Sequence, residues 1–254
     1  MELFDLSGKT AIITGSSRGI GKAIAERMAE HGARVVISSR KAAPCNEVAE
    51  AINKKHGAGR AIAIPANISS KEELQRLVDE TKKAFGDIHI LVCNAAANPY
   101  YGPLAQIPDD AFRKILENNI VANNWLISMV VPEMRARRDG SIMIVSSIGG
   151  LRGSSVIGAY CISKAADMQL ARNLAVEYGP DNVRVNCIAP GLIKTDFAKA
   201  LWDDPETLKK STAGAALKRI GDPDEIAGCA VFLAGKAGAF VTGQNFVIDG
   251  GQTI

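Results

Sequence analysis

Ser147, Tyr160 and Lys164 are three residues whose types and spacing suit proton transfer. A Tyr and a Lys four residues apart lie on one face of a helix, so the Lys164 ammonium favours the ionised form of Tyr160. A free Tyr titrates at about 10, and a nearby cation lowers that pKa. A Ser147 hydroxyl in the same pocket would hold a substrate oxygen while Tyr160 exchanges a proton with it. Alone, such a Tyr–Lys pair also occurs by chance on helix surfaces, so the interpretation needs support elsewhere in the chain.

A glycine-rich turn follows the first apolar run. Residues 10–13 have the pattern of a buried strand, and a helical pattern runs from Lys22 to His31. Gly15, Gly19 and Gly21 lie between them and allow the backbone to turn tightly towards a pyrophosphate at the helix N-terminus. The spacing Gly-x-x-x-Gly-x-Gly differs from the commonest dinucleotide fingerprint, and a glycine turn can also be a plain tight connection.

The same turn contains a rival Gly-x-Ser-x-Gly pattern, with Ser17 at its centre, which is typical of serine hydrolases. Only one predicted strand precedes Ser17, whereas a hydrolase needs an earlier strand–helix loop to supply oxyanion donors. None of the three histidines lies in a later strand-end loop, where a catalytic triad would need one. Hydrolysis is therefore the disfavoured alternative.

Strand-like runs alternate with helical stretches along the 254 residues. This alternation predicts an α/β fold: a Rossmann-type, doubly wound parallel sheet with helices on both faces. Because no linker or repeat divides the chain, residues 1–254 are expected to form a single dinucleotide-binding and catalytic domain. After the strand at residues 10–13, the expected strands are residues 34–38, 60–65, 88–93, 141–146, 183–189 and 245–248. Ligands of such sheets bind at the carboxyl ends of the strands.

Taken together, the glycine turn, Ser147, Tyr160 and Lys164 resemble the short-chain dehydrogenase/reductase family over essentially the whole chain. Asn119 resembles the family's helical catalytic Asn. The run from Leu91 to Ala96 looks like its Asn-Asn-Ala-Gly segment, and residues 190–195 match its Pro-Gly turn and Thr. Within the family, residues 94–99, 131–134 and 184–195 look most like NADP-dependent carbonyl and retinal reductases.

The resemblance implies four catalytic residues, Asn119, Ser147, Tyr160 and Lys164. In reduction Tyr160 would be the acid, and Ser147 would hydrogen-bond the carbonyl oxygen. Lys164 would lower the pKa of Tyr160 and bind the nicotinamide ribose, while Asn119 would hold a relay water. The residues expected at the cofactor are Gly15, Ser17, Arg18, Gly19, Ile20, Gly21, Ser39, Arg40, Lys41, Asn67, Ile68, Asn94, Ala95, Tyr160, Lys164, Pro190, Gly191, Ile193 and Thr195.

Three positions depart from the family's pattern. Cys93 and Ala96 stand where the family usually has Asn and Gly. Asn67 stands where an Asp commonly contacts the adenine, although an amide also donates or accepts a hydrogen bond there. The changes affect the path of the cofactor and leave the proposed chemical groups untouched.

The end of the second strand favours NADP(H) over NAD(H). An NAD site usually has an acidic residue there to hold the ribose hydroxyls, and this chain has none. Ser39, Arg40 and Lys41 instead suit a 2′-phosphate, and Arg18 would add a positive charge. The alternative is that Arg40 and Lys41 begin a solvated loop.

The expected reaction is reversible hydride transfer between nicotinamide and a carbonyl or secondary alcohol. Residues 98–103 and a helical lid at residues 196–214 would shape the substrate site, and their apolar side chains favour a hydrophobic ketone or aldehyde. Trp202, in this lid, could equally belong to a core or an interface. A sugar or polyol dehydrogenase, another secondary-alcohol dehydrogenase and a 3-oxoacyl thioester reductase remain open. So does a non-catalytic NADP-binding scaffold or regulator.

Charge and composition favour a small-molecule substrate and argue against nucleic-acid, metal and membrane functions. The net charge of +3 is mild, and the one dense basic run, residues 135–138, is expected to end a helix whose dipole favours cations. The five cysteines lack metal-ligand spacing and are expected to be free buried thiols, which fits a reducing compartment. No signal core or long apolar run is present, so a cytoplasmic location is expected.

The helix expected at residues 159–178 carries a small apolar surface, which includes Ile162, Ala165 and Leu174. The family resemblance implies a homodimer or homotetramer built on such helices and on the segment at residues 240–251. Burial of this surface inside one subunit is the alternative.

Overall fold

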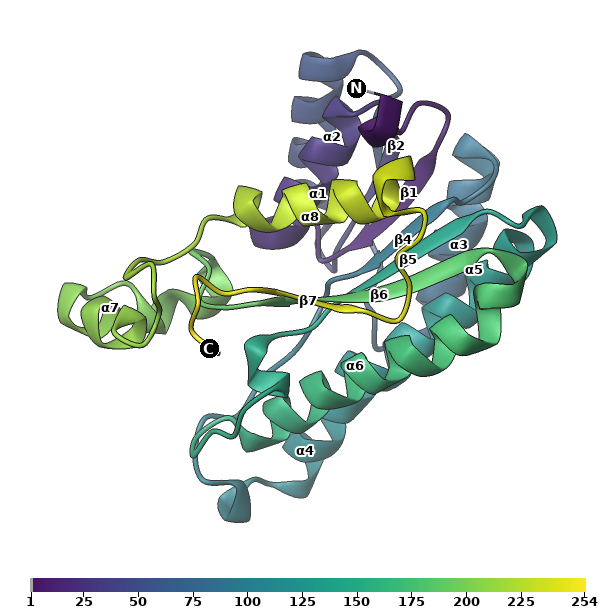
Figure 1. Ribbon diagram of the computed structural model, residues 1–254. Coiled ribbons are helices and arrows are strands. Elements are labelled where there is room, and N and C mark those ends of the chain that lie inside the picture. The colour runs from purple at the N-terminus through teal and green to yellow at the C-terminus, as the bar shows by residue number, and fades with distance from the viewer. Residues whose placement is uncertain (1) are drawn as a thin grey trace.

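Seven parallel strands form the central sheet of the computed structural model, which describes residues 2–254 (Figure 1). Their order is β3-β2-β1-β4-β5-β6-β7. The strands are β1 (Thr10–Thr14), β2 (Arg34–Ser38), β3 (Ala61–Ala63), β4 (Ile90–Cys93), β5 (Gly140–Val145), β6 (Val183–Pro190) and β7 (Asn245–Ile248). The predicted doubly wound parallel sheet is confirmed, and the third strand is shorter than the expected residues 60–65.

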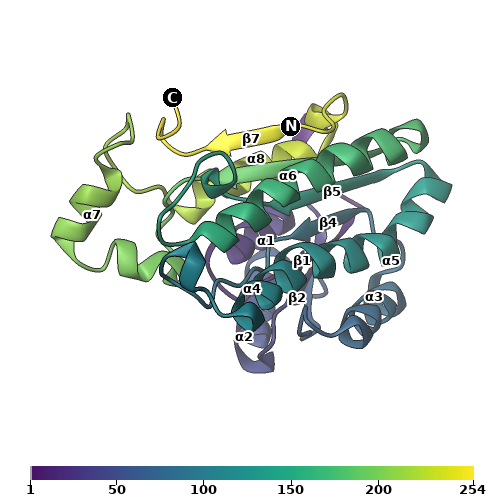
Figure 2. The ribbon, with the colours of Figure 1, turned by 90° about the horizontal axis from the view of Figure 1, so that it is seen from below.

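Helices cover both faces of this sheet (Figures 1 and 2). One face is covered by α1 (Gly19–Glu30), α2 (Ala42–His56) and α8 (Pro223–Ala234), and the other by α3 (Lys71–Phe85), α5 (Ala122–Arg137) and α6 (Gly158–Tyr178). Two shorter helices are α4 (Asp109–Leu116), beside α6, and α7 (Pro205–Thr212), which lies apart from the strands in both views. No helix among residues 2–254 is long and apolar enough to cross a membrane.

The five inner strands are almost wholly buried, which explains why their sequences are continuous apolar runs, whereas the edge strands β3 and β7 are more exposed. In β1, Ile12 packs with the cluster that includes α3, α5 and α6, whereas Ala11 and Ile13 pack with α1, α2 and α8. Successive side chains of a strand point to opposite faces, so one strand supplies both cores. Each fully buried Ile contributes about 1.5–3 kcal/mol relative to an exposed one.

The strand order reverses between β1 and β4, and ligands of open parallel sheets bind beyond the carboxyl ends of the strands at such a reversal. The glycine turn follows β1, and the segment that begins at Asn94 follows β4. Residues distant in sequence are therefore neighbours at this edge of the sheet.

Helix α1 begins at Gly19, three residues earlier than the expected Lys22, so Gly21 lies within its first turn. A Cβ at Gly21 would lie 2.5 Å from both the Asn94 Nδ2 atom and the Gly15 carbonyl oxygen. Glycine is required there because the helix approaches the neighbouring loop closely.

We expect Gly21→Ala to destabilise the fold by about 1–3 kcal/mol, because the added methyl group has to displace packed backbone and amide atoms. Urea unfolding measures the loss. Gly228→Ala is the matched control: this glycine lies inside α8 and a Cβ there would meet nothing within 4 Å. The control should be as stable as the unchanged protein or more stable. Equal stability of the two variants would contradict the packing argument.

Candidate active site

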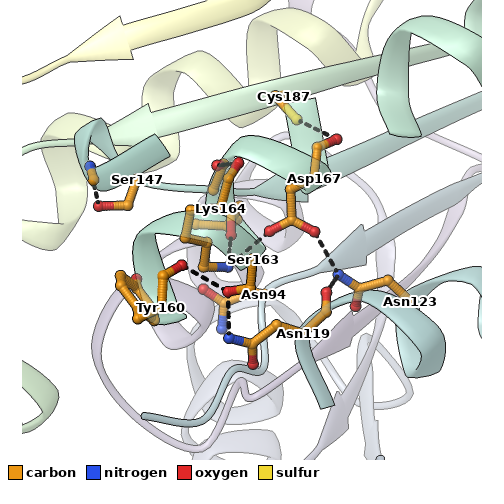
Figure 3. Close-up of polar contacts among 12 residues, drawn as sticks. Asn94, Asn119, Asn123, Ser147, Tyr160, Ser163, Lys164, Asp167 and Cys187 are labelled. Atoms are coloured by element: carbon orange, nitrogen blue, oxygen red, sulfur yellow. Dashed lines mark hydrogen bonds and ion pairs between the residues drawn. The ribbon is translucent and has the colours of Figure 1, made fainter. Parts of the chain in front are cut away.

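Tyr160 and Lys164 lie one turn apart on α6, as predicted, and Ser147 follows β5 (Figure 3). The Lys164 Nζ atom is 5.6 Å from the centroid of the Tyr160 ring. A Cβ placed on Gly149 would lie 3.4 Å from Ser147 Oγ and 3.7 Å from Tyr160 Cε1. The Ser147 hydroxyl and the Tyr160 ring therefore border the same small space.

Tyr160 holds its proton more tightly than a free tyrosine. Although the side chain keeps partial solvent access, desolvation raises its pKa, and the opposing effects of Lys164 and Ser147 are smaller. The expected lowering of the pKa by Lys164 is therefore present but outweighed by burial. At neutral pH Tyr160 is a phenol, the form that donates a proton.

Lys164 is a buried ammonium with only 2% of its side chain exposed. Its Nζ donates hydrogen bonds of 2.9 Å to the Val145 carbonyl oxygen and of 2.9 Å to Oδ2 of Asp167. Burial acts to lower the pKa of Lys164, but the charge of Asp167 and the nearby Tyr160 together raise it above its ordinary value. The ammonium is thus charged at neutral pH.

Asn119 lies in a π-helical turn, Glu117–Val121, between α4 and α5. Its Oδ1 accepts a 2.8 Å hydrogen bond from Ala97 N, and its Nδ2 donates to Ala97 O at 3.1 Å and to Ser163 Oγ at 3.0 Å. Ser163 Oγ in turn donates to Tyr160 O at 2.7 Å. The Asn119 side chain therefore ties the loop after β4 to helix α6, as Figure 3 shows in part.

The glycine turn after β1 is held against the segment that follows β4. Asn94 Nδ2 donates to the carbonyl oxygens of Thr14, at 2.9 Å, and Gly15, at 3.2 Å. Gly15 and Gly19 have φ angles of 67° and 57°, a left-handed conformation that favours glycine. No side chain within residues 2–254 caps the N-terminus of α1, so its first N–H groups are available to an anion. These features fit the pyrophosphate of a dinucleotide.

The residues expected at the far end of the cofactor follow β2 and β3. Arg40 and Lys41 are exposed, and within the described chain neither pairs with a carboxylate. Ser39 Oγ lies 3.1 Å from Cys45 Sγ, which orients it beside the start of α2. Asn67 follows β3, and its Oδ1 accepts a hydrogen bond from Ser69 N. Ile68, next in sequence, packs against the core on the α3 side.

Arg18, unlike Arg40 and Lys41, lies beside a carboxylate. Its NH1 atom lies 3.1 Å from Oδ2 of Asp196, the first residue of the expected lid, and both side chains are mostly exposed. An exposed pair of this kind contributes little to stability. Arg18 is therefore free to exchange partners at small cost.

The segment after β6 lies beside the glycine turn and leads into the expected lid, residues 196–214. A Cβ on Gly19 would lie 3.1 Å from Thr195 Cγ2, and a Cβ on Gly191 would lie 2.7 Å from Asp249 Cα. Pro190 ends β6 and Ile193 is buried in the core on the α1 side. The expected candidates Pro190, Gly191, Ile193 and Thr195 therefore all lie along the same edge of the sheet.

Residues 196–214, the expected lid, contain a 3₁₀ helix at Asp196–Leu201 followed by α7, so their helical character is confirmed. Phe197 is 60% exposed, and its ring centroid lies 6.1 Å from that of Tyr160. Trp202 Nε1 donates a 2.9 Å hydrogen bond to the Thr195 carbonyl oxygen. This hydrogen bond holds Trp202, which lies within residues 196–214, against Thr195, the residue just before them.

The structure also shows contributors that the sequence patterns did not identify. Thr14 Oγ1 accepts hydrogen bonds from the backbone N–H groups of Asn94, at 3.0 Å, and Ala95, at 3.1 Å. Ser16 Oγ donates to Ile13 O at 2.6 Å and accepts from Ser38 N at 2.9 Å. Both residues join the ends of neighbouring strands, and a polar residue beside a strand-end glycine is the signal that points to them.

Asn123 and Asp167 are two further contributors, and both are buried. Asp167 follows Lys164 by three residues and Asn123 follows Asn119 by four, which are helical spacings that place side chains side by side. Helical spacing is therefore the signal that could have identified them.

Comparison with known proteins agrees with the fold and the site. The family model described as "Enoyl-(Acyl carrier protein) reductase" matches residues 15–253. Dehydrogenase/reductase SDR family member 4 of Bos taurus is 42% identical over 248 residues, covering 97% of this chain and 88% of that protein.

Two solved structures are similar over nearly their whole length. A 7α-hydroxysteroid dehydrogenase complexed with NADH and 7-oxo glycochenodeoxycholic acid has a TM-score of 0.93 and 37% identity, covering 98% of this chain and 96% of that chain. Pseudomonas aeruginosa RhlG, solved as an NADP active-site complex, has a TM-score of 0.93 and 34% identity, with 100% of both chains covered.

The fold and these matches define an oxidoreductase that transfers hydride between a nicotinamide cofactor and a CH–OH or C=O group. The chain belongs to the short-chain dehydrogenase/reductase family.

We expect Thr14→Val to destabilise the protein by about 1–3 kcal/mol, because it leaves the buried N–H groups of Asn94 and Ala95 without their acceptor. Thr10→Val is the matched control on the same strand, because Thr10 Oγ1 is buried and has no partner in the described residues. The control should be neutral or stabilising. Urea unfolding of both variants compares them directly, and a Thr10→Val loss as large as that of Thr14→Val would overturn the assignment.

Proposed function

We propose that the protein is an NADP(H)-dependent reductase of hydrophobic ketones or aldehydes that also works in reverse on the secondary alcohols. The observation that carries this proposal is the space bordered by the Ser147 hydroxyl and the Tyr160 phenol, beside the buried Lys164 ammonium. A proton donor, a hydrogen-bond donor and a fixed positive charge then surround one carbonyl oxygen.

Each of the four candidate catalytic residues has a distinct task in this proposal. When bound, the nicotinamide supplies the hydride. Tyr160, which is a phenol at neutral pH, donates its phenolic proton to the substrate oxygen. Ser147 hydrogen-bonds the same oxygen while negative charge develops on it.

Lys164 has three N–H donors, of which Val145 and Asp167 occupy two. The third remains for a ribose hydroxyl of the nicotinamide nucleotide. The positive charge also favours the phenolate that Tyr160 forms after donating its proton.

Asn119 holds the relay water through its backbone rather than its side chain. The side-chain amide is committed to Ala97 and Ser163. The backbone carbonyl oxygen of Asn119 accepts a 2.6 Å hydrogen bond from Asn123 Nδ2 and would accept a second hydrogen bond from the relay water. Through that water a proton would pass from solvent to Lys164 and on to Tyr160.

The preference for NADP(H) rests on the residues that follow β2. Arg40 and Lys41 are exposed and have no carboxylate partner within residues 2–254, so both are available to a 2′-phosphate. Arg18 would join them by leaving Asp196. Because one similar structure was solved with NADP and another with NADH, the preference depends on this chain's own residues.

A hydrophobic substrate is supported by apolar side chains in the loops that follow β4, β5 and β6. Large exposed apolar residues there are Tyr101, Leu104, Leu151, Phe197 and Leu201. Phe197 lies beside the Tyr160 ring, so apolar surface of the lid reaches the position where a carbonyl would react.

We also propose a cytoplasmic homodimer or homotetramer. Ile162 on α6 and Phe240 before β7 are exposed apolar residues on the segments expected to associate. Leu174, assigned to the same surface, is buried within the subunit. Light scattering after size-exclusion chromatography measures the assembly.

Tyr160→Phe should lower turnover by about 10²-fold to 10⁴-fold, because the substrate oxygen loses its proton donor. The assay follows NADPH oxidation with a panel of diketones, aryl ketones, retinoids, sugars and acyl thioesters. Cofactor binding, measured by NADPH fluorescence, should be unchanged and serves as the control. A variant with near-full rate would overturn the role of Tyr160.

The panel also separates the alternatives. Turnover confined to sugars or to acyl thioesters would replace the hydrophobic-carbonyl proposal by a polyol dehydrogenase or a thioester reductase. Tight NADPH binding without turnover on any substrate would favour a non-catalytic scaffold.

Arg40→Ala should weaken NADPH binding by about 10-fold to 100-fold, because the 2′-phosphate loses a charge-assisted hydrogen bond. NADH, which lacks this phosphate, should bind the variant as it binds the unchanged protein. Arg76→Ala, an exposed arginine on α3, is the control for the loss of one positive charge. If the unchanged protein bound NADH more tightly than NADPH, the cofactor preference would be wrong.

A further inference from the structure

Asp167 is a buried carboxylate to which the proposed reaction assigns no task. It lies on α6, one turn after Lys164, and its side chain is 0% exposed (Figure 3). Burying a charge is costly unless it is paired and hydrogen-bonded. The groups around Asp167 must therefore stabilise its charge.

The two carboxylate oxygens of Asp167 have different partners. Oδ2 accepts the 2.9 Å hydrogen bond from Lys164 Nζ, and Oδ1 accepts a 3.2 Å hydrogen bond from Asn123 Nδ2. The same Asn123 amide donates to the Asn119 carbonyl oxygen. Asp167 therefore links the Lys164 ammonium to the π-helical turn that carries Asn119, as Figure 3 shows.

Other titratable groups near this pair come from three elements. Tyr160 lies on α6, Cys93 on β4 and Cys187 on β6. Burial raises the pKa of both thiols far above neutrality, so they carry no charge. The Cys187 thiol contacts the backbone oxygen of Asp167, at 3.4 Å, and not its carboxylate. Asp167 is thus the one carboxylate facing Lys164 in the described part of the chain.

We propose that Asp167 is a positioning residue that keeps Lys164 charged and aims its remaining N–H donor at the nicotinamide-ribose side of Tyr160. This inference deepens the proposed function and rests on it. The Val145 carbonyl supplies a dipole but no charge, so it cannot replace the carboxylate as the partner of a buried ammonium. A neutral amine would neither favour the Tyr160 phenolate nor pass a proton to it.

Stability alone does not require such a pair, because two apolar side chains can fill a buried site as well as an ion pair does. The pair is instead positioned where a fixed charge matters for proton transfer: one turn from Tyr160 and in contact with the support of Asn119.

The first test measures Lys164 directly in the cofactor-free protein. NMR of isotope-labelled lysine ε-carbons follows its titration, and the Lys164→Met variant identifies its signal. In Asp167→Asn the titration midpoint of Lys164 should fall by about one to three pH units, because the opposing charge is gone. Asp167→Glu, which restores the charge, should return the midpoint towards that of the unchanged protein. An unchanged midpoint in Asp167→Asn would overturn the proposal.

The second test is the pH dependence of NADPH-linked reduction. The alkaline limb should move to lower pH in Asp167→Asn, because Lys164 loses its proton earlier. Cys187→Ala is the matched control: it removes a neighbour of Asp167 but no charge, so its pH profile should match that of the unchanged protein. A shift of equal size in Cys187→Ala would mean that packing, not charge, is responsible, and would overturn the proposal.

Folding of the variants is checked by a double substitution. If Asp167→Asn is unstable because of an unpaired ammonium, Lys164→Met/Asp167→Asn should recover stability, which supports the pairing. If the double variant is equally unstable, Asp167 has a purely structural role and the proposal is wrong. Failure of the proposed function is distinguishable, because the unchanged protein would then turn over no substrate while the NMR titration still decides the state of Lys164.

Discussion

A positive charge buried beside the Tyr160 phenol is the constraint on which the candidate site depends. Lys164 is almost fully enclosed, so its ammonium has to be stabilised by the protein and not by water. The Val145 carbonyl at the end of β5 and the Asp167 carboxylate on α6 provide this support, and Asn123 holds the carboxylate from α5. Strand β5 and helices α5 and α6 therefore all contribute to stabilising the Lys164 ammonium. Moving any of these elements would leave a buried ion without its partner, so the charge constrains how the sheet and the helices pack.

The candidate cofactor site is shaped mainly by the backbone. There the backbone, more than any side-chain charge, prepares the site: the left-handed glycines 15 and 19 shape the turn, and the uncapped start of α1 presents N–H groups. Thr14 and Asn94 fix this turn against the end of β4 by hydrogen bonds in both directions. The reversal of strand order between β1 and β4 is what brings these two segments together.

The sequence predicted the sheet, its helices and the meeting of the strand ends, because parallel strands buried on both faces leave long apolar runs. It was less accurate where several weak effects compete. Helix α1 begins before the expected Lys22, since Gly19 and Gly21 take part in its first turn. The sequence predicted that Lys164 lowers the pKa of Tyr160, which the structure confirms, but it could not give the net shift because a sequence does not show the extent of burial. Asp167 has a helical spacing to Lys164 that is equally common on exposed surfaces, so only the fold shows that the pair is buried.

In the proposed function, the reaction and the choice of substrate depend on different parts of this chain. The groups proposed for proton transfer lie in or against the buried core, whereas Phe197, Leu201 and Tyr101 lie exposed in the lid and in a strand-end loop. Loops tolerate change that a packed core does not. Family membership therefore carries over the reaction class, and the hydroxysteroid dehydrogenase, at a TM-score of 0.93, shares the scaffold without specifying the ligand. In the proposed function the substrate is selected by the apolar side chains near Tyr160, and the ring of Phe197, with its centroid 6.1 Å from that of Tyr160, is one of them.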